Sequence, residues 1–83
     1  MTIQVYNLGR DIRDADLRRL FSVYGIVNSA EVVRDKLNGR SKGNGIINMP
    51  VDKDALQAIE SLDQTMMDGK KISVTEMRMP PNW

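Results

Sequence analysis

The stretch of residues 42–49, KGNGIINM, constrains what this chain can fold into more than any other. As a β-strand it sends alternate side chains to opposite faces. One face then carries Gly43 and Gly45, and glycine inside a strand indicates that another element packs close to the backbone. We therefore expect a helix to cover the glycine face, together with Ile47 and Met49, and the opposite face to be open. The open face would carry a cation, two amides and one isoleucine, namely Lys42, Asn44, Ile46 and Asn48.

Three other stretches alternate apolar and polar residues, as strands do. With the first stretch they give four expected strands, at residues 2–8, 26–34, 42–49 and 70–77. Between them, apolar residues recur at helical spacing in residues 14–25 and 52–62. Asp14 and Asp52 are expected to cap these helices, and Gly25 to end the first one in the left-handed conformation. Asn38 and Gly39 predict a tight chain reversal between the second and third strands.

The resulting order, β-α-β-β-α-β, predicts an α+β domain of the ferredoxin-like class, a split βαβ sandwich. Its four-stranded antiparallel sheet would carry two helices on one face and leave the other face open. With 83 residues, the chain is large enough for one domain with a modest core. We expect this domain to span residues 1–79, followed by a short tail at residues 80–83.

Two segments of the expected sheet resemble the signature of a known family, the RNA recognition motif. Residues 42–49 are similar to its octamer, basic-Gly-aromatic-Gly/Ala-aromatic-aliphatic-x-aromatic, and residues 3–8, IQVYNL, are similar to its hexamer, aliphatic-aromatic-aliphatic-x-Asn-Leu. The resemblance covers about residues 2–77 and implies binding of single-stranded RNA on the open sheet face. Where the family usually has base-stacking rings, this chain has Gln4, Asn44 and Ile46.

The composition makes catalysis improbable. The chain has no cysteine and no histidine, so it lacks a thiolate nucleophile and the commonest general base and metal ligand. The same order of elements supports small phosphatases, but residues 9–13 hold one glycine and an aspartate where such enzymes need an anion-cradling loop. We therefore expect no enzyme, no cofactor and no metal. The absence of a signal segment and of a long apolar run predicts a cytoplasmic protein without membrane contact.

The net charge is only +1, yet the cations and the carboxylates fall on different elements. The acidic residues belong mainly to the expected helices and their edges. Seven cations fall instead on the last three strands, their loops or the tail: Arg34, Lys36, Arg40, Lys42, Lys70, Lys71 and Arg78. Such a distribution favours phosphate contacts on the sheet side, although a solvated charged face is the alternative.

The expected RNA-binding residues combine these cations with polar and apolar side chains of the open face. Tyr6 supplies a ring displaced by two residues from the usual position of Gln4. Asn7 either contacts RNA or fixes the junction between strand and loop. Trp83 in the tail either returns across the sheet or is a frayed terminus. The full expected set is Gln4, Tyr6, Asn7, Arg34, Lys36, Arg40, Lys42, Asn44, Ile46, Asn48, Lys71, Ser73, Thr75 and Arg78.

Because each base stacked on an aromatic ring contributes roughly 1–3 kcal/mol, the missing rings predict weak binding with low sequence specificity. We expect a monomer that holds single-stranded RNA, and to some degree single-stranded DNA, mostly through phosphates. The alternative is a protein-interaction module on the same fold. It would use the ring-poor face, with Val33, Ile46 and the methionines near the sheet edge, Met66, Met77 and Met79, to receive a peptide or a second copy.

Overall fold

The computed structural model describes residues 1–34, 36–39 and 41–77. Four residues named above, Arg40, Arg78, Met79 and Trp83, lie outside the described residues, as does the side chain of Lys42. The elements are β1 (Thr2–Tyr6), α1 (Asp14–Ser22), β2 (Ser29–Arg34), β3 (Ser41–Asn48), α2 (Asp52–Leu62), β4 (Met66–Met67), β5 (Lys70–Lys71) and β6 (Ser73–Glu76).

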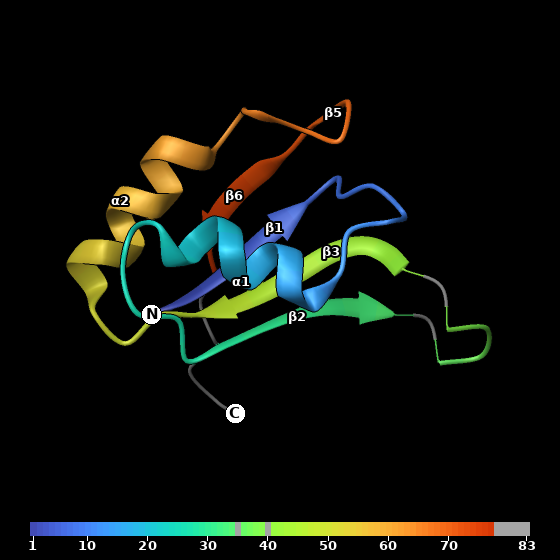
Figure 1. Ribbon diagram of the computed structural model, residues 1–83, viewed down its shortest axis with the longest axis horizontal. Coiled ribbons are helices and arrows are strands. Elements are labelled where there is room, and N and C mark those ends of the chain that lie inside the picture. The colour runs from blue at the N-terminus through green and yellow to red at the C-terminus, as the bar shows by residue number, and fades with distance from the viewer. Residues whose placement is uncertain (35, 40, 78–83) are drawn as a thin grey trace.

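One four-stranded antiparallel sheet forms the centre of the molecule, with strand order β2-β3-β1-β6. Helices α1 and α2 both lie on the same side of this sheet (Figure 1). The ferredoxin-like fold predicted from the sequence is therefore confirmed. Figure 1 also shows β5 set apart from the main sheet, where it pairs with β4 in a separate two-stranded ribbon.

The fourth predicted strand, residues 70–77, is divided in the structure. Lys70 and Lys71 belong to β5, and only Ser73–Glu76 pair with β1. The division occurs at Ile72, whose N–H donates to the carbonyl of Thr65 at 2.9 Å and whose carbonyl accepts from the N–H of Gln64 at 2.9 Å. These bonds engage the backbone of Ile72 with the loop after α2 instead of with β1. The prediction that Lys71 lies on the main sheet is therefore wrong.

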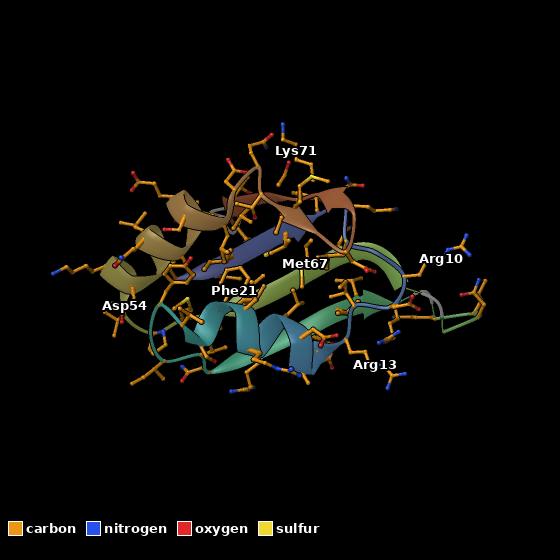
Figure 2. All side chains as sticks on the ribbon, turned by 45° about the horizontal axis from the view of Figure 1, so that its top comes forward. Arg10, Arg13, Phe21, Asp54, Met67 and Lys71 are labelled. Carbon is orange, nitrogen blue, oxygen red and sulfur yellow. The ribbon has the colours of Figure 1, made fainter. Side chains whose placement is uncertain are left out.

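The core lies between the sheet and the helices. Its fully buried side chains come from the inner face of the sheet and its flanks and from both helices, with Ala55 and Ala58 on α2. The largest are Phe21, Ile3, Leu17, Ile47, Met49, Ile72, Val5 and Val74. Met67 is half-buried and packs against this core, and Figure 2 shows it and Phe21 between the sheet and the helices. The predicted inward positions Ile47 and Met49 are confirmed.

Different features of the structure explain why β3 has glycine at positions 43 and 45. At Gly45 a Cβ atom would lie 2.6 Å from Cδ1 of Leu17, so the predicted close approach of a helix is confirmed there. Gly43 instead has a φ of +81°, in a segment where the β2–β3 pairing shifts register between Val33 and Arg34. No helical atom is among the nearest neighbours of a Cβ built at Gly43. Glycine is favoured at this position by its backbone conformation.

Both predicted helix caps are wrong. The N-cap residues are Arg13 and Val51, and each aspartate is the first residue of its helix. Asp14 Oδ1 accepts a hydrogen bond from the N–H of Val32 at 2.7 Å, which ties the start of α1 to β2. The prediction that α1 ends at Gly25 is also wrong, because the helix ends at Ser22.

Gly25 follows α1 in a conformation with φ +159°, which is not the predicted left-handed helical one. A Cβ atom at Gly25 would collide with the carboxylate of Asp54 on α2. Close approach to α2 therefore explains this glycine. The chain reversal predicted at Asn38 and Gly39 is confirmed by a turn over residues 36–38, with Gly39 at φ +70°.

Candidate nucleic-acid interface

The open face of the sheet is arranged in rows that cross the strands. Register places Val33, Asn44, Tyr6 and Ser73 in one row, from β2 through β3 and β1 to β6. The next row holds Glu31, Ile46, Gln4 and Thr75. A third row, at the other end of the strands, holds Ser29, Asn48 and Thr2. Seven sheet residues predicted for the site therefore share one face, and it is the face that the helices leave uncovered: Gln4, Tyr6, Asn44, Ile46, Asn48, Ser73 and Thr75.

Tyr6 is the aromatic side chain that this face presents within the described residues. It is 39% exposed, so the prediction that its ring stays outside the core is confirmed. Asn44 lies directly across from it on β3, and Ser73 lies directly across on β6. Side chains opposite each other on antiparallel strands have Cβ atoms about 4.5–5.5 Å apart. The ring is thus bordered by an amide on one side and a hydroxyl on the other.

The remaining polar side chains of the face differ in how they are held. Asn48 Nδ2 donates to Thr2 Oγ1 at 3.4 Å, and Asn48 Oδ1 accepts from Asn28 Nδ2 at 3.4 Å, so this amide is engaged by its neighbours. Gln4 and Asn44 have no such partner among the described residues. Glu31 lies across from Ile46 and places a carboxylate in the second row.

Asn7 fixes the junction between β1 and the loop that follows it, one of the two roles that the sequence left open. It has a φ of +66°, a conformation that asparagine tolerates better than most residues. Its Nδ2 donates to the carbonyl oxygen of Lys71 at 2.8 Å. The side chain thereby joins the end of β1 to β5, across 64 residues of sequence.

Of the seven cations assigned to the sheet side from the sequence, the four whose side chains the structure describes lie at the β2–β3 connection and on the β4–β5 ribbon. Arg34 ends β2 and Lys36 follows in the turn, and both are exposed. Lys70 and Lys71 are exposed on β5. Within residues 1–34, 36–39 and 41–77, none of these four side chains is in an ion pair with a carboxylate. Their charges are available to a polyanion.

Gln64 is a further polar side chain beside this face that the sequence analysis did not assign to the site. Its Nε2 donates to Asp63 Oδ1 at 3.2 Å and to Ser73 Oγ at 3.4 Å. Asp63 Oδ1 also accepts the N–H of Val74 at 2.9 Å. This backbone hydrogen bond, followed by that from Gln64, lowers the pKa of Asp63 below its ordinary value.

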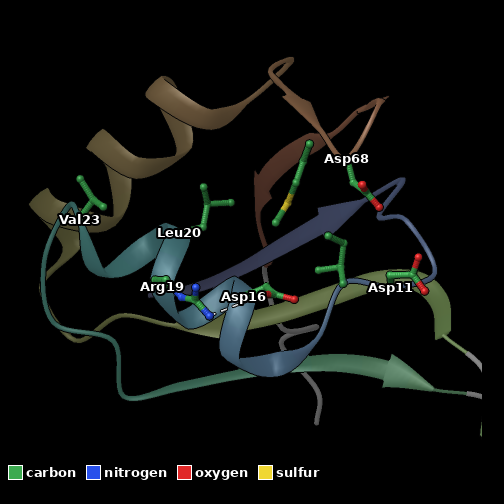
Figure 3. A pocket seen from close by; sticks show the side chains of 8 residues that line it. Asp11, Asp16, Arg19, Leu20, Val23 and Asp68 are labelled. Carbon is green, nitrogen blue, oxygen red and sulfur yellow. Dashed lines mark ion pairs between the residues drawn. The ribbon is translucent and has the colours of Figure 1, made fainter.

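A hollow of about 590 Å³ lies on the helical side, between α1 and β4 (Figure 3). Its lining includes three carboxylates and one cation, Arg19, which is 3.7 Å from Asp16. Leu20, Val23 and Met67 give it an apolar wall. Because uncompensated carboxylates repel phosphate, this hollow is unsuited to a nucleic acid. The lining residues are Asp11, Ile12, Asp16, Arg19, Leu20, Val23, Met67 and Asp68.

A family model described as RNA recognition motif matches residues 3–73. The chain belongs to this family. The resemblance stated from residues 3–8 and 42–49 is therefore confirmed, and with it the class of function expected of the domain, RNA binding. The open face of this member lacks the rings that the family usually has at the positions of Gln4, Asn44 and Ile46.

Relatives match this RNA recognition motif domain along nearly its whole length. The putative RNA-binding protein RbpA of Synechocystis sp. is 33% identical over 82 residues, which are 99% of this chain and 81% of that protein. The chloroplastic 28 kDa ribonucleoprotein of Nicotiana sylvestris is 40% identical over 79 residues, which are 95% of this chain and 29% of that protein. The chain thus spans less than a third of the length of the Nicotiana relative.

Solved structures of other proteins show the same fold. The crystal structure titled RNA binding protein PG1 has a TM-score of 0.92 and 40% identity, and the match covers 99% of both chains. A structure titled SXL-lethal protein/RNA complex has a TM-score of 0.90 and 26% identity, covering 98% of this chain and 48% of that one. In the part of this chain that the structure describes, no helix has the length and apolarity that crossing a membrane requires.

Proposed function

We propose that this domain binds single-stranded RNA across the open face of its sheet, with Tyr6 as the main stacking platform. The observation that carries the proposal is a 39% exposed ring at the end of the central strand β1, on a sheet face that no helix covers. Bases of single-stranded RNA stack on such rings, and amides and hydroxyls beside a ring can bond base edges. Asn44 and Ser73 stand in those positions.

Phosphate contacts supply most of the proposed affinity. Arg34 and Lys36 lie where the β2–β3 connection leaves the open face, and both are exposed. A ring-poor face leaves few base contacts, so the affinity is low and the sequence preference of the whole site is small. Single-stranded DNA binds too, because stacking and phosphate contacts do not depend on the sugar. A monomer in the cytoplasm stays a prediction.

Tyr6→Ala tests the stacking role directly. Loss of one base–ring stack costs about 1–3 kcal/mol, a roughly 5- to 150-fold weaker dissociation constant. The control is Tyr6→Phe, which keeps the ring and should bind nearly as the unmodified domain does. The measurement is a chemical-shift titration with short mixed-sequence RNA at low salt. If the RNA perturbs no resonance of β1 or β3, the proposed interface is wrong.

Arg34→Ala and Lys36→Ala test the phosphate contacts. Each should weaken binding to all sequences alike and reduce the slope of log affinity against log salt by about 1. Lys53→Ala removes an exposed cation from α2, on the helical side, and is the matched control. An unchanged salt slope in the Arg34 and Lys36 variants would place the phosphates elsewhere.

The alternative, a protein-interaction module on this face, has less support from the geometry. The two apolar residues offered for docking on the sheet face itself, Val33 and Ile46, lie in different rows, and each is paired with a polar residue on the neighbouring strand, Asn44 and Glu31 respectively. The apolar surface is therefore broken by an amide and a carboxylate. Capture of a protein partner that persists at high salt after nuclease treatment would favour this alternative.

A further inference from the structure

Gln64 occupies a backbone conformation that is unusual for its residue type. Its φ is +65°, in the left-handed region that glycine adopts without strain. Its N–H is bonded to the carbonyl oxygen of Ile72 at 2.9 Å, which fixes the residue at the edge of β6. The long amide side chain therefore leaves the loop at a defined point beside the open face.

The amide of Gln64 is also fixed in orientation. Its Nε2 donates to Asp63 Oδ1 at 3.2 Å and to Ser73 Oγ at 3.4 Å, which engages both of its N–H groups. Reversing the amide would turn its oxygen toward the carboxylate of Asp63, which the N–H of Val74 holds at 2.9 Å and keeps ionised. The carbonyl oxygen Oε1 therefore faces away from Asp63, and no described residue donates to it.

This amide, fixed by Asp63 and Ser73, is connected to the row of Tyr6 through Ser73. Ser73 is the direct cross-strand partner of Tyr6, and Gln64 contacts the hydroxyl of Ser73. That hydroxyl accepts from Gln64, so its own hydrogen is left to donate. On the β6 side of Tyr6 the face thus offers one hydrogen-bond acceptor, Gln64 Oε1, and one hydrogen-bond donor, Ser73 Oγ.

We propose that Tyr6, Ser73 and Gln64 form a single-nucleotide subsite that selects adenine and cytosine, through the 6-amino or 4-amino group of the base, over uracil. The inference rests on the proposed function. Adenine and cytosine each present an amine donor beside a ring nitrogen that accepts, which complements Gln64 Oε1 and Ser73 Oγ. Uracil presents the reverse, a keto oxygen beside an N–H, and the keto oxygen would be opposed to Oε1.

The experiment compares RNA pentamers that differ only in the central base, UUXUU with X as adenine, cytosine or uracil, by fluorescence anisotropy. We expect the adenine and cytosine pentamers to bind about 5- to 10-fold more tightly than the uracil pentamer, the scale of one favourable hydrogen bond gained in place of a repulsive contact. A chemical-shift titration with the adenine pentamer should place the largest changes at Tyr6, Gln64 and Ser73.

Gln64→Gly should bring the three affinities to within about twofold of one another, because the adenine and cytosine pentamers lose an acceptor and the uracil pentamer is relieved of the repulsive contact. The variant is expected to fold, because glycine suits the φ of +65°, and its amide spectrum checks this. Ser73→Ala removes the hydroxyl donor and leaves the loop after α2 unchanged in sequence. It should halve or abolish the preference for the adenine and cytosine pentamers over the uracil pentamer. Gln57→Ala, which removes an exposed amide from α2, is the matched control and should keep the preference.

The outcomes separate the inference from the proposed function. Equal affinities of the unmodified domain for all three pentamers would overturn the amine-selecting subsite while leaving RNA binding intact. A preference that survives in Gln64→Gly would overturn the role of the amide. Failure to bind any of the pentamers, at low salt, would overturn the RNA platform itself and the subsite with it.

Discussion

Gly45→Ala is expected to lower the free energy of unfolding by about 1–2 kcal/mol, although alanine is ordinarily the better strand residue. The added Cβ would lie 2.6 Å from Cδ1 of Leu17 and 3.1 Å from Cδ1 of Leu8. Leu17 is fully buried, so its methyl group has no solvent to move into. Overpacking of this kind costs about 1–3 kcal/mol, and the gain from replacing a strand glycine, about 0.5–1 kcal/mol, offsets part of it.

Urea denaturation followed by circular dichroism measures the change, and heating should show a midpoint lower by roughly 4–16 °C. Leu17→Ala in the same background separates crowding from other effects, because a smaller side chain makes room for the new methyl group. The double variant should then lose less stability than the sum of the two single variants. An unchanged or raised stability of Gly45→Ala, or strict additivity with Leu17→Ala, would refute the close packing of α1 on β3.

Other contacts lead to three further expectations. Asp14→Ala should destabilise the domain by about 1–2 kcal/mol in urea denaturation, because it removes the acceptor of the Val32 N–H, whereas Asp14→Asn keeps an acceptor and should cost less. Gly69→Ala should cost about 1 kcal/mol from its φ of +81° alone, since nothing lies within 4 Å of the new Cβ, and a loss above about 3 kcal/mol would contradict this. The pKa of Asp63 is lowered in the folded state, so its carboxylate stabilises the fold at pH values above its unfolded-state pKa. This stabilisation is lost as the pH falls through the folded-state pKa. The free energy of unfolding should therefore fall less steeply with decreasing pH in Asp63→Asn than in the unmodified domain. An identical pH dependence of the two would contradict the hydrogen bonds to Asp63.

The sheet was predictable because alternation in sequence determines which side chains share a face. Gln4 and Tyr6 on β1, and Asn44 and Ile46 on β3, follow from a period of two once the strands are placed. Their pairing, Tyr6 with Asn44 and Gln4 with Ile46, needed the register that the structure supplies. The interruption at Ile72 was not predictable, since residues 70–77 alternate without a break and the bonds to Thr65 and Gln64 come from a distant loop.

Local sequence rules failed where a distant group competes for a side chain. Asp14 has the residue type that commonly caps a helix, but its carboxylate is bonded to the N–H of Val32, 18 residues away. The helix then starts one residue earlier than expected, at Asp14, with Asp16 Oδ2 accepting the N–H of Arg13 at 2.9 Å. Gln64 was not assigned to the site because a side chain that reaches the sheet from a loop produces no periodic pattern in the sequence.

The charges of the open face restrict how RNA can lie on it under the proposed function. Glu31 shares a row with Ile46 and Gln4, so a phosphate over that row would meet a carboxylate. The Tyr6 row carries no acidic side chain, and its β2 end leads to Arg34. Bases are therefore best accommodated along the Tyr6 row, with the phosphates directed toward the β2–β3 connection. This path brings the stacked base to the border formed by Ser73 and Gln64, which is where the proposed selection of the amine takes place.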